Sequence, residues 1–152
     1  PMLKYKLSQI DSISKKVLLN LSKTDCIFLF GELGSGKTTF TRSLINQIQE
    51  KNKVAKTEVP SPTFNLLYEY EIKSLKVMHY DLYRLKTKKE IEQLGIFEDS
   101  KNIISIIEWP EKMQKEIENR LEITFYHETD EESRKIKFDG FGKWKNFKLD
   151  AI

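Results

Sequence analysis

GELGSGKT, residues 31–38, matches the pattern GxxxxGK[ST] at every fixed position. In such a loop, successive backbone amides surround nucleotide phosphates, while the lysine and the hydroxyl serve phosphate and Mg²⁺. The preceding run DCIFLF, residues 25–30, is short and apolar, as is typical of a buried strand. Over residues 37–50, apolar side chains recur at helical spacing and predict an amphipathic helix. Strand, loop and helix therefore follow in the order that the motif requires, and the sequence predicts a nucleoside triphosphate site.

The residues of this loop have separate expected roles. Gly31, Gly34 and Gly36 allow positive φ angles and a close approach of the backbone to the phosphates. We expect Lys37 to reach the β- and γ-phosphates, and the Thr38 hydroxyl to be a Mg²⁺ ligand. A Gly-rich turn that only caps a helix is the alternative, and the flanking strand and helix disfavour it. The expected nucleotide-binding residues of the loop are Gly31, Glu32, Leu33, Gly34, Ser35, Gly36, Lys37, Thr38 and Thr39.

Length and composition indicate one globular domain, which we assign to residues 1–152. A chain of 152 residues buries about two-thirds of its unfolded surface. The formal net charge is +3, from 26 basic and 23 acidic residues, which is no strong nucleic-acid signature. The single cysteine, Cys26, excludes an internal disulfide and suits a small buried hydrophobe. No cleavable N-terminal apolar segment and no run of about 18 apolar residues is present, so we expect a cytoplasmic protein without membrane association. Pro1 is interpreted as a tag remnant.

Periodicity in the remaining N-terminal half predicts both strands and a helix. Alternating residues 3–8 predict a half-buried strand, and the apolar spacing over residues 10–21 predicts an amphipathic helix. Residues 64–72 and 76–82 resemble two strands that turn at residues 73–74. We therefore expect an antiparallel element after the first βα unit.

The C-terminal half continues in the same manner. A capping box at residues 87–90 begins a helix that stops near Gly95. The further expected elements are a buried strand at 103–107, a short helix from Pro110 through 117, and strands at 121–126 and 135–138. The tail, residues 141–152, is ambiguous. Together these patterns predict an α/β fold: one P-loop NTPase domain with a central mixed sheet flanked by helices.

Two acidic residues end predicted strands and are candidates for the metal site. Asp81 closes residues 77–81, and Glu108 closes residues 103–108. Hydrolysis requires a carboxylate at a strand end that holds Mg²⁺ or its water, and either residue can stand at that edge of the sheet. A solvated acid just past a strand is the alternative for each, so the choice between them stays open. Thr63 lies on a proline-braced loop where nucleotide switches place a γ-phosphate sensor, although an ordinary strand-initiating threonine fits equally.

Four motifs taken together resemble the bacterial TsaE (YjeE) family in order and spacing. They are GELGSGKTT at 31–39, SPTF at 61–64, HYDLYRL at 79–85 and IEWPE at 107–111. The similarity extends over most of the chain. It implies a Mg²⁺-dependent P-loop ATPase that binds ATP/ADP and works with TsaB and TsaD in making N6-threonylcarbamoyladenosine beside the anticodon of tRNA. TsaD carries the transfer chemistry, so the resemblance implies an ATP-driven step for repeated turnover, with tRNA met only through the complex.

The family pattern also implies site residues. It places Thr38 and Glu108 at the Mg²⁺ ion, Asp81 as the Walker B-like acid that also serves the metal, and Thr63 in the switch loop. The expected catalytic residues are Lys37, Thr63, Asp81 and Glu108.

Other positions carry weaker implications. Trp109 falls on the family's EW pair, where it contacts either nucleotide or a partner. Arg134 matches an arginine that approaches the nucleotide, but Ser133 stands here where the family has glycine. His79 and His127 lack metal-ligand spacing and are interpreted as packing or surface residues.

Competing functions remain for this sequence. A nucleotide-gated adaptor with negligible hydrolysis of its own is the main one. A small-molecule kinase is disfavoured because such an enzyme carries an arginine-bearing lid, whereas the arginines of this chain occur singly. A GTPase is disfavoured because this chain has no NKxD string. Direct tRNA binding would use a basic, aromatic-interleaved tail, for which a solvated face with packed aromatics is the alternative. The tail residues are Lys135, Lys137, Phe141, Lys143, Trp144, Lys145, Phe147 and Lys148.

Overall fold

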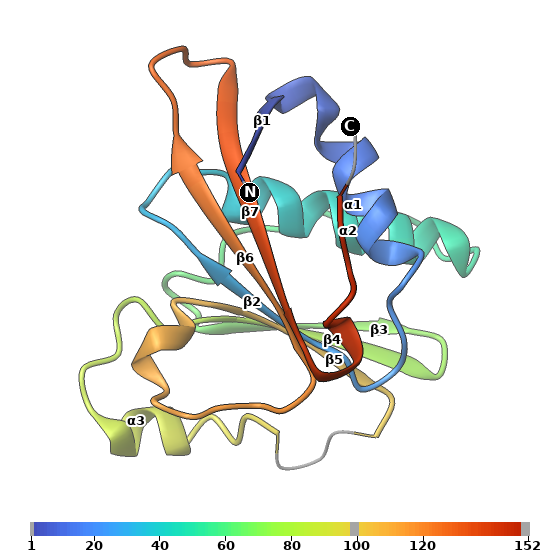
Figure 1. Ribbon diagram of the computed structural model, residues 1–152. Helices are drawn as coiled ribbons and strands as arrows, with labels where there is room; N and C mark the ends of the chain where they lie inside the picture. The colour runs from blue at the N-terminus through green and yellow to red at the C-terminus, as the bar shows by residue number, and fades with distance from the viewer. Residues whose placement is uncertain (1, 98–100, 150–152) are drawn as a thin grey trace.

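The computed structural model describes residues 2–97 and 101–149 (Figure 1). Within them the chain forms a seven-stranded mixed sheet in the order β1-β7-β6-β2-β5-β4-β3. The strands are β1 (Leu3–Lys6), β2 (Cys26–Phe30), β3 (Leu67–Ile72), β4 (Leu75–Asp81), β5 (Ile103–Glu108), β6 (Arg120–His127) and β7 (Ser133–Phe141). The helices are α1 (Ile10–Leu18), α2 (Lys37–Lys51) and α3 (Lys88–Glu92), with 3-10 turns η1 (Leu7–Gln9), η2 (Pro110–Lys112) and η3 (Gly142–Trp144). The predicted α/β fold with a central mixed sheet is confirmed.

The middle of the sheet is parallel and its two edges are antiparallel. Strand β2 runs parallel to both β5 and β6, and β4 runs parallel to β5. Strand β3 pairs antiparallel with β4, which confirms the expected antiparallel element, and β7 pairs antiparallel with β6 and β1. Parallel neighbours end at the same edge of a sheet. Side chains from β2, β4 and β5 therefore meet there, next to the loop that enters α2.

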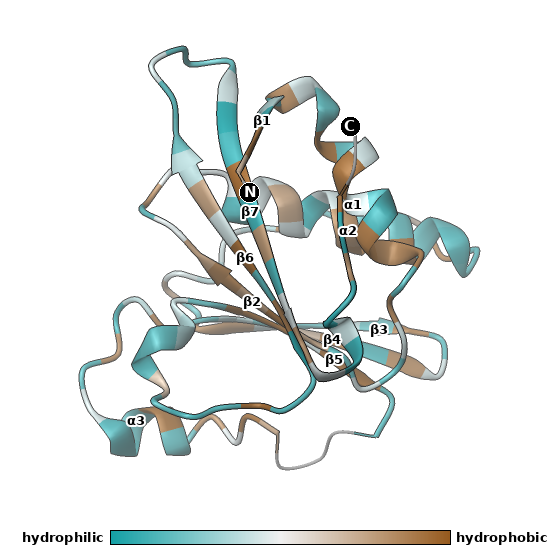
Figure 2. Cartoon of the chain, viewed as in Figure 1, coloured by the Kyte–Doolittle hydropathy of each residue, from teal (hydrophilic) through white to brown (hydrophobic). Residues whose placement is uncertain are grey.

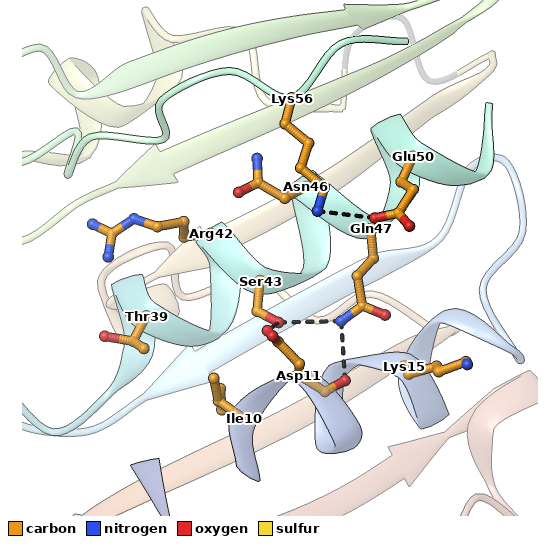
Figure 3. Close-up of a pocket in the computed structure, with 10 residues that line it drawn as sticks. All are labelled: Ile10, Asp11, Lys15, Thr39, Arg42, Ser43, Asn46, Gln47, Glu50 and Lys56. Carbon is orange, nitrogen blue, oxygen red and sulfur yellow. Dashed lines mark hydrogen bonds and ion pairs between the residues drawn. The ribbon is translucent and has the colours of Figure 1, made fainter. Parts of the chain in front are cut away.

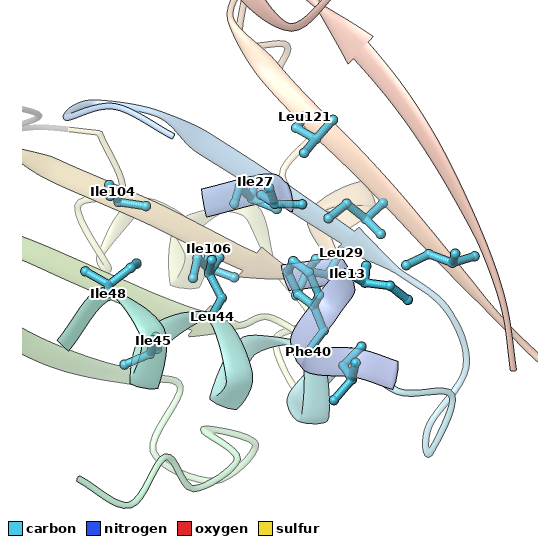
Figure 4. Close-up of a cluster of buried hydrophobic side chains, with 14 of the residues drawn as sticks. Ile13, Ile27, Leu29, Phe40, Leu44, Ile45, Ile48, Ile104, Ile106 and Leu121 are labelled. Carbon is cyan, nitrogen blue, oxygen red and sulfur yellow. The ribbon is translucent and has the colours of Figure 1, made fainter. Parts of the chain in front are cut away.

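The two faces of the sheet are covered by different helices (Figure 1). Successive strand residues point to opposite faces, so Ile27 and Leu29 pack with α1 and α2, whereas Cys26 and Phe28 pack on the side of α3. Figure 4 shows the first cluster, where Phe40 and Leu44 of α2 lie against these strands. Apolar residues follow the central strands and the inward faces of α1 and α2 (Figure 2). None of the helices within the described ranges has the length and apolar character needed to cross a membrane.

Two C-terminal segments differ from a simple reading of the pattern. The helix expected over residues 110–117 is wrong beyond its first turn, because Gln114 adopts φ 51° in the left-handed region and ends the 3-10 turn.

The C-terminal tail, which the sequence left ambiguous, packs inward: the Trp144 side chain is 1% exposed and Leu149 lies in the core. Lys143 Nζ lies 2.7 Å from Oδ2 of buried Asp25. These contacts favour packed aromatics over a free basic strip. Pro1, which the sequence suggests is a tag remnant, and residues 150–152 of the tail lie outside the described residues.

Candidate nucleotide-binding site

The loop between β2 and α2 has the backbone that the motif predicts. Gly31, Gly34 and Gly36 adopt φ of 142°, 76° and 122°, conformations that disfavour any residue with a Cβ. Space is limiting as well: a Cβ on Gly31 would lie 2.7 Å from the carbonyl oxygen of Phe125. The glycines therefore let the loop fold closely over β6 and bring its amides to the start of α2.

A cavity of about 220 Å³ opens beside this loop. Its walls come from the loop and the first turn of α2, from η1, from the segment before β3, from the ends of β4 and β5, and from the start of β7. The lining residues are Leu7, Leu33, Gly34, Gly36, Lys37, Thr38, Thr39, Ser61, Thr63, Asp81, Glu108 and Arg134. All four residues expected to be catalytic and all three expected metal ligands are among them. Gly31, Glu32, Ser35 and Trp109 do not line it.

Lys37 is a buried cation at the floor of this site. Its side chain donates to the Gly31 carbonyl oxygen at 2.5 Å, and Nζ lies 3.9 Å from the centroid of the Trp109 ring. Burial lowers the pKa of Lys37, while the facing Glu108 and Asp81 carboxylates oppose that shift. A positive charge with so little water around it acts strongly on a nearby anion.

Glu108 stands where β5 leaves the sheet and is 2% exposed. Its Oε2 accepts a hydrogen bond from Thr38 Oγ1 at 3.5 Å, across from the first turn of α2. The same oxygen lies 2.6 Å from Nε2 of His79, a side chain that is fully buried. One carboxylate thus connects the phosphate loop to the interior of the sheet.

Asp81 lies beside Glu108, because the β4–β5 register pairs these two residues directly. Its Oδ2 accepts from Thr63 Oγ1 at 3.0 Å, and its Oδ1 accepts from the Tyr83 backbone N–H at 2.9 Å. Burial raises the pKa of the Asp81 carboxyl, against the lowering effect of the Tyr83 N–H; the charge of Glu108 raises this pKa further. The loop that carries Thr63 is thereby attached to the same acidic edge.

The donor set fits a magnesium ion that also binds phosphate. Two carboxylates and one hydroxyl face a single cavity, and Mg²⁺ in phosphate sites takes one or two carboxylates, with phosphate oxygens and water completing its ligands. The described residues contain no group of three or more His, Cys, Asp or Glu side chains placed to hold a metal ion by themselves. Seven buried side-chain polar atoms lack a partner among the described residues, and five of them belong to the loop or to residues that contact it or the lining residues: Tyr5 Oη, Ser35 Oγ, His79 Nδ1, Trp109 Nε1 and Arg134 Nε. The other two are Tyr70 Oη and Trp144 Nε1. Such atoms are rare unless a ligand or water completes them.

Comparison with known proteins agrees with this arrangement. The family model described as "Threonylcarbamoyl adenosine biosynthesis protein TsaE" matches residues 5–136. The chain belongs to the TsaE family. The resemblance seen in the sequence is confirmed.

Individual TsaE relatives support the same assignment. A protein named tRNA threonylcarbamoyladenosine biosynthesis protein TsaE from Rickettsia typhi is 40% identical over 100 residues, which cover 66% of this chain and 67% of that protein. The protein of the same name from Aquifex aeolicus is 35% identical over 125 residues, covering 82% and 84%. The crystal structure of Bacillus subtilus YdiB is similar in fold, with a TM-score of 0.63, 26% identity and coverage of 93% of this chain and 87% of that one.

Two residues that the TsaE resemblance suggested lie at the rim of the site. Trp109 adopts φ 61°, and its ring packs at a tilt against Tyr83 with the ring centroids 4.8 Å apart. Nζ of Lys37 lies over the same Trp109 ring, although Trp109 does not line the cavity. Arg134 is the second residue of β7 and lines the cavity, with Nη2 3.5 Å from the Gly34 carbonyl oxygen. The replacement of glycine by Ser133 therefore does not remove Arg134 from the site.

Sequence reasoning missed several neighbours in this TsaE-family site. His79 is buried, as its interpretation as a packing residue requires, but it also makes a hydrogen bond to Glu108 that this interpretation did not include. Its position two residues before Asp81 on one strand was an available signal, because such residues share a face. Leu7 and the buried Tyr5 had no local signal: the pairing of β1 with β7 brings them to the loop.

A second cavity, of about 480 Å³, lies between α1 and α2 (Figure 3). Thr39 lines both cavities. A polar network joins the two helices here: Ser43 Oγ bonds Asp11 Oδ1, and Gln47 Nε2 donates to the Asp11 carbonyl oxygen at 3.0 Å. The helix that carries Lys37 and Thr38 is thus attached to α1 by polar as well as apolar contacts.

Proposed function

We propose that this protein binds ATP or ADP with Mg²⁺ and hydrolyses ATP to support threonylcarbamoyl modification of the adenosine beside the anticodon of tRNA. One observation carries the proposal: Lys37, Thr38, Asp81 and Glu108, from three separate segments, face one cavity beside a glycine-rich loop. Membership of the TsaE family supports the pathway. The proposal places the protein in the cytoplasm.

Each residue has a role that follows from its position. The loop amides and Lys37 bind the phosphates, with the Trp109 ring shielding the cation from water. Thr38, Glu108 and Asp81 hold the metal or its water, and the metal neutralises the charge of the phosphate oxygens when it is bound. Thr63 reaches Asp81 from a separate loop, so a change at the γ-phosphate can be passed to that loop.

The partners that we propose are TsaB and TsaD, with tRNA met only through their complex. Three large apolar side chains near the site are exposed. Leu33, which lines the cavity, is 56% exposed; Phe64, which follows Thr63 in the chain, is 78% exposed; and Tyr83, whose ring packs on Trp109, is 40% exposed. Exposed apolar groups that cluster at a functional site are typical of protein interaction surfaces. This supports a partner that contacts the nucleotide end of the molecule.

The proposal is tested by reconstitution of tRNA modification at limiting TsaD. Addition of this protein with ATP and Mg²⁺ should allow more modified tRNA than TsaD molecules present, and Lys37→Ala protein should not. Modification that stops at one round with the wild-type protein, or proceeds equally with Lys37→Ala, would contradict the proposal.

A nucleotide-gated adaptor is the second candidate, and the exposed side chains of Leu33, Phe64 and Tyr83 favour it equally. ATP turnover with and without a TsaB–TsaD complex separates the two functions. Strong stimulation by the complex supports a partner-activated ATPase. Unchanged, negligible turnover with ATP-dependent binding supports the adaptor. A small-molecule kinase has less support, because Arg134 is the one arginine among the described residues that lines the cavity.

A further inference from the structure

His79 is a buried histidine whose polar atoms serve no purpose in packing. Its side chain is 0% exposed, its Nε2 lies 2.6 Å from Glu108 Oε2, and its Nδ1 has no partner among the residues that the structure describes. A buried polar atom without a partner destabilises the fold, and an apolar side chain of similar size would avoid that cost. The hydrogen bond to Glu108 is therefore what the imidazole contributes at this position.

The bond follows from the strand register. Asp81 pairs with Glu108 across the parallel strands β4 and β5. His79 lies two residues before Asp81, so its side chain projects from the same face and reaches Glu108 as a diagonal neighbour. Thr38 approaches the same carboxylate oxygen from α2, with Oγ1 at 3.5 Å. His79 itself does not line the cavity.

We propose that His79 is a positioning residue, which holds the Glu108 carboxylate beside Thr38 in the orientation that serves the Mg²⁺ of a bound nucleotide. A glutamate has several rotatable bonds, and without this partner the carboxylate could turn toward the Lys37 charge that faces it. A short hydrogen bond to one carboxylate oxygen restricts that rotation. The inference rests on the proposed function, because it takes Glu108 to serve the metal.

The test compares two amide substitutions of similar polarity. In His79→Gln the amide nitrogen takes the place of Nε2 and can still donate to Glu108. In His79→Asn it takes the place of Nδ1 and falls short of Glu108. The affinity of each purified protein for a fluorescent ADP analogue is measured across a Mg²⁺ titration and in EDTA, with the wild type alongside.

We expect His79→Asn to reduce the gain in affinity that Mg²⁺ provides by about tenfold or more, as for other residues that orient metal ligands, with affinity in EDTA unchanged. His79→Gln should retain most of that gain. An unaltered Mg²⁺ dependence in His79→Asn, or equal losses in Mg²⁺ and EDTA, would overturn the positioning role. If the nucleotide affinity of the wild-type protein does not depend on Mg²⁺, the proposed metal site itself is contradicted, and the inference about His79 fails with it.

A second measurement applies if His79→Asn does not fold. In wild-type protein with ¹⁵N-labelled histidine, the Nε2 resonance of His79 is followed while Mg²⁺ is added to the ADP complex. The resonance should shift when the metal binds, because its hydrogen-bond acceptor changes partner. A shift is expected for His79 and a smaller one for His127, which contacts the loop at the Leu33 carbonyl oxygen. No shift at His79 on metal binding would overturn the inference.

Discussion

Replacing Lys37 with methionine removes a buried charge while nearly preserving the length of the side chain. In the structure Nζ donates to the Gly31 carbonyl oxygen and lies over the Trp109 ring. With a nucleotide bound, this group would donate at least one charge-assisted hydrogen bond to phosphate, worth about 1.5–3 kcal/mol. Since 1.4 kcal/mol is a factor of ten, loss of one such bond weakens binding by about 10- to 140-fold.

The structure also indicates where in this range the result should fall. Glu108 and Asp81 stabilise the charge of Lys37, and its Nζ donates to the Gly31 carbonyl oxygen. A bound phosphate would compete with the Gly31 carbonyl oxygen for this amino group, so the hydrogen bond that is given up offsets part of the attraction to phosphate. We therefore expect the lower half of the range.

Isothermal titration with ADP and Mg²⁺ measures the effect at neutral pH. The matched control is Lys51→Met, which makes the same chemical change at the exposed far end of α2. The control should bind like the wild type. Wild-type affinity in Lys37→Met, with a melting curve that shows a folded protein, would refute the assignment of the phosphate site.

Three other substitutions test separate parts of the argument. Asp81→Asn should weaken Mg²⁺-dependent nucleotide binding but increase the free energy of unfolding at neutral pH. Burial raises the pKa of Asp81 above its ordinary value of 3.8, so the wild type loses stability as the pH rises from 3.8 through the raised pKa. Below pH 3.8 the carboxyl is protonated in both the folded and the unfolded protein, and the difference between the two proteins should disappear. Urea unfolding across this pH interval measures it, and a constant difference would count against the pKa shift. Lys143→Met leaves buried Asp25 without its cation and should lower the free energy of unfolding by about 1–3 kcal/mol. The loss is smaller than for a fully buried pair because the Lys143 side chain is 36% exposed. An unchanged urea midpoint would argue against a stabilising ion pair. Gly36→Ala forces a Cβ at φ 122° to within 3.0 Å of the Tyr5 hydroxyl, and should cost about 1–3 kcal/mol of stability and weaken ADP binding; full retention of both would mean that the loop relaxes freely.

Most of the fold could be predicted because its elements have strong local signals. The glycine loop, the apolar strands around it and the amphipathic helices each depend on residues close together in the chain. The helix expected after Pro110 was wrong beyond its first turn. The local pattern allowed further turns, but it did not show that Gln114 adopts a left-handed conformation between η2 and β6.

The candidate site was predicted unevenly. Lys37 and Thr38 belong to one motif, so their proximity to each other is local. Asp81 and Glu108 could be placed at strand ends, but their adjacency depends on the order and register of β4 and β5, which no single segment specifies.

The sequence by itself determined that a glycine-rich loop between a buried strand and a helix presents a lysine and a hydroxyl, because backbone conformation there depends on glycines a few residues apart. Tertiary structure decided the rest. The parallel pairing of β4 with β5 set His79 against Glu108, and the pairing of β1 with β7 brought Leu7 and Arg134 to the cavity. These contacts join residues that are distant in the chain, and they form only when hydrophobic burial selects one strand order and one register.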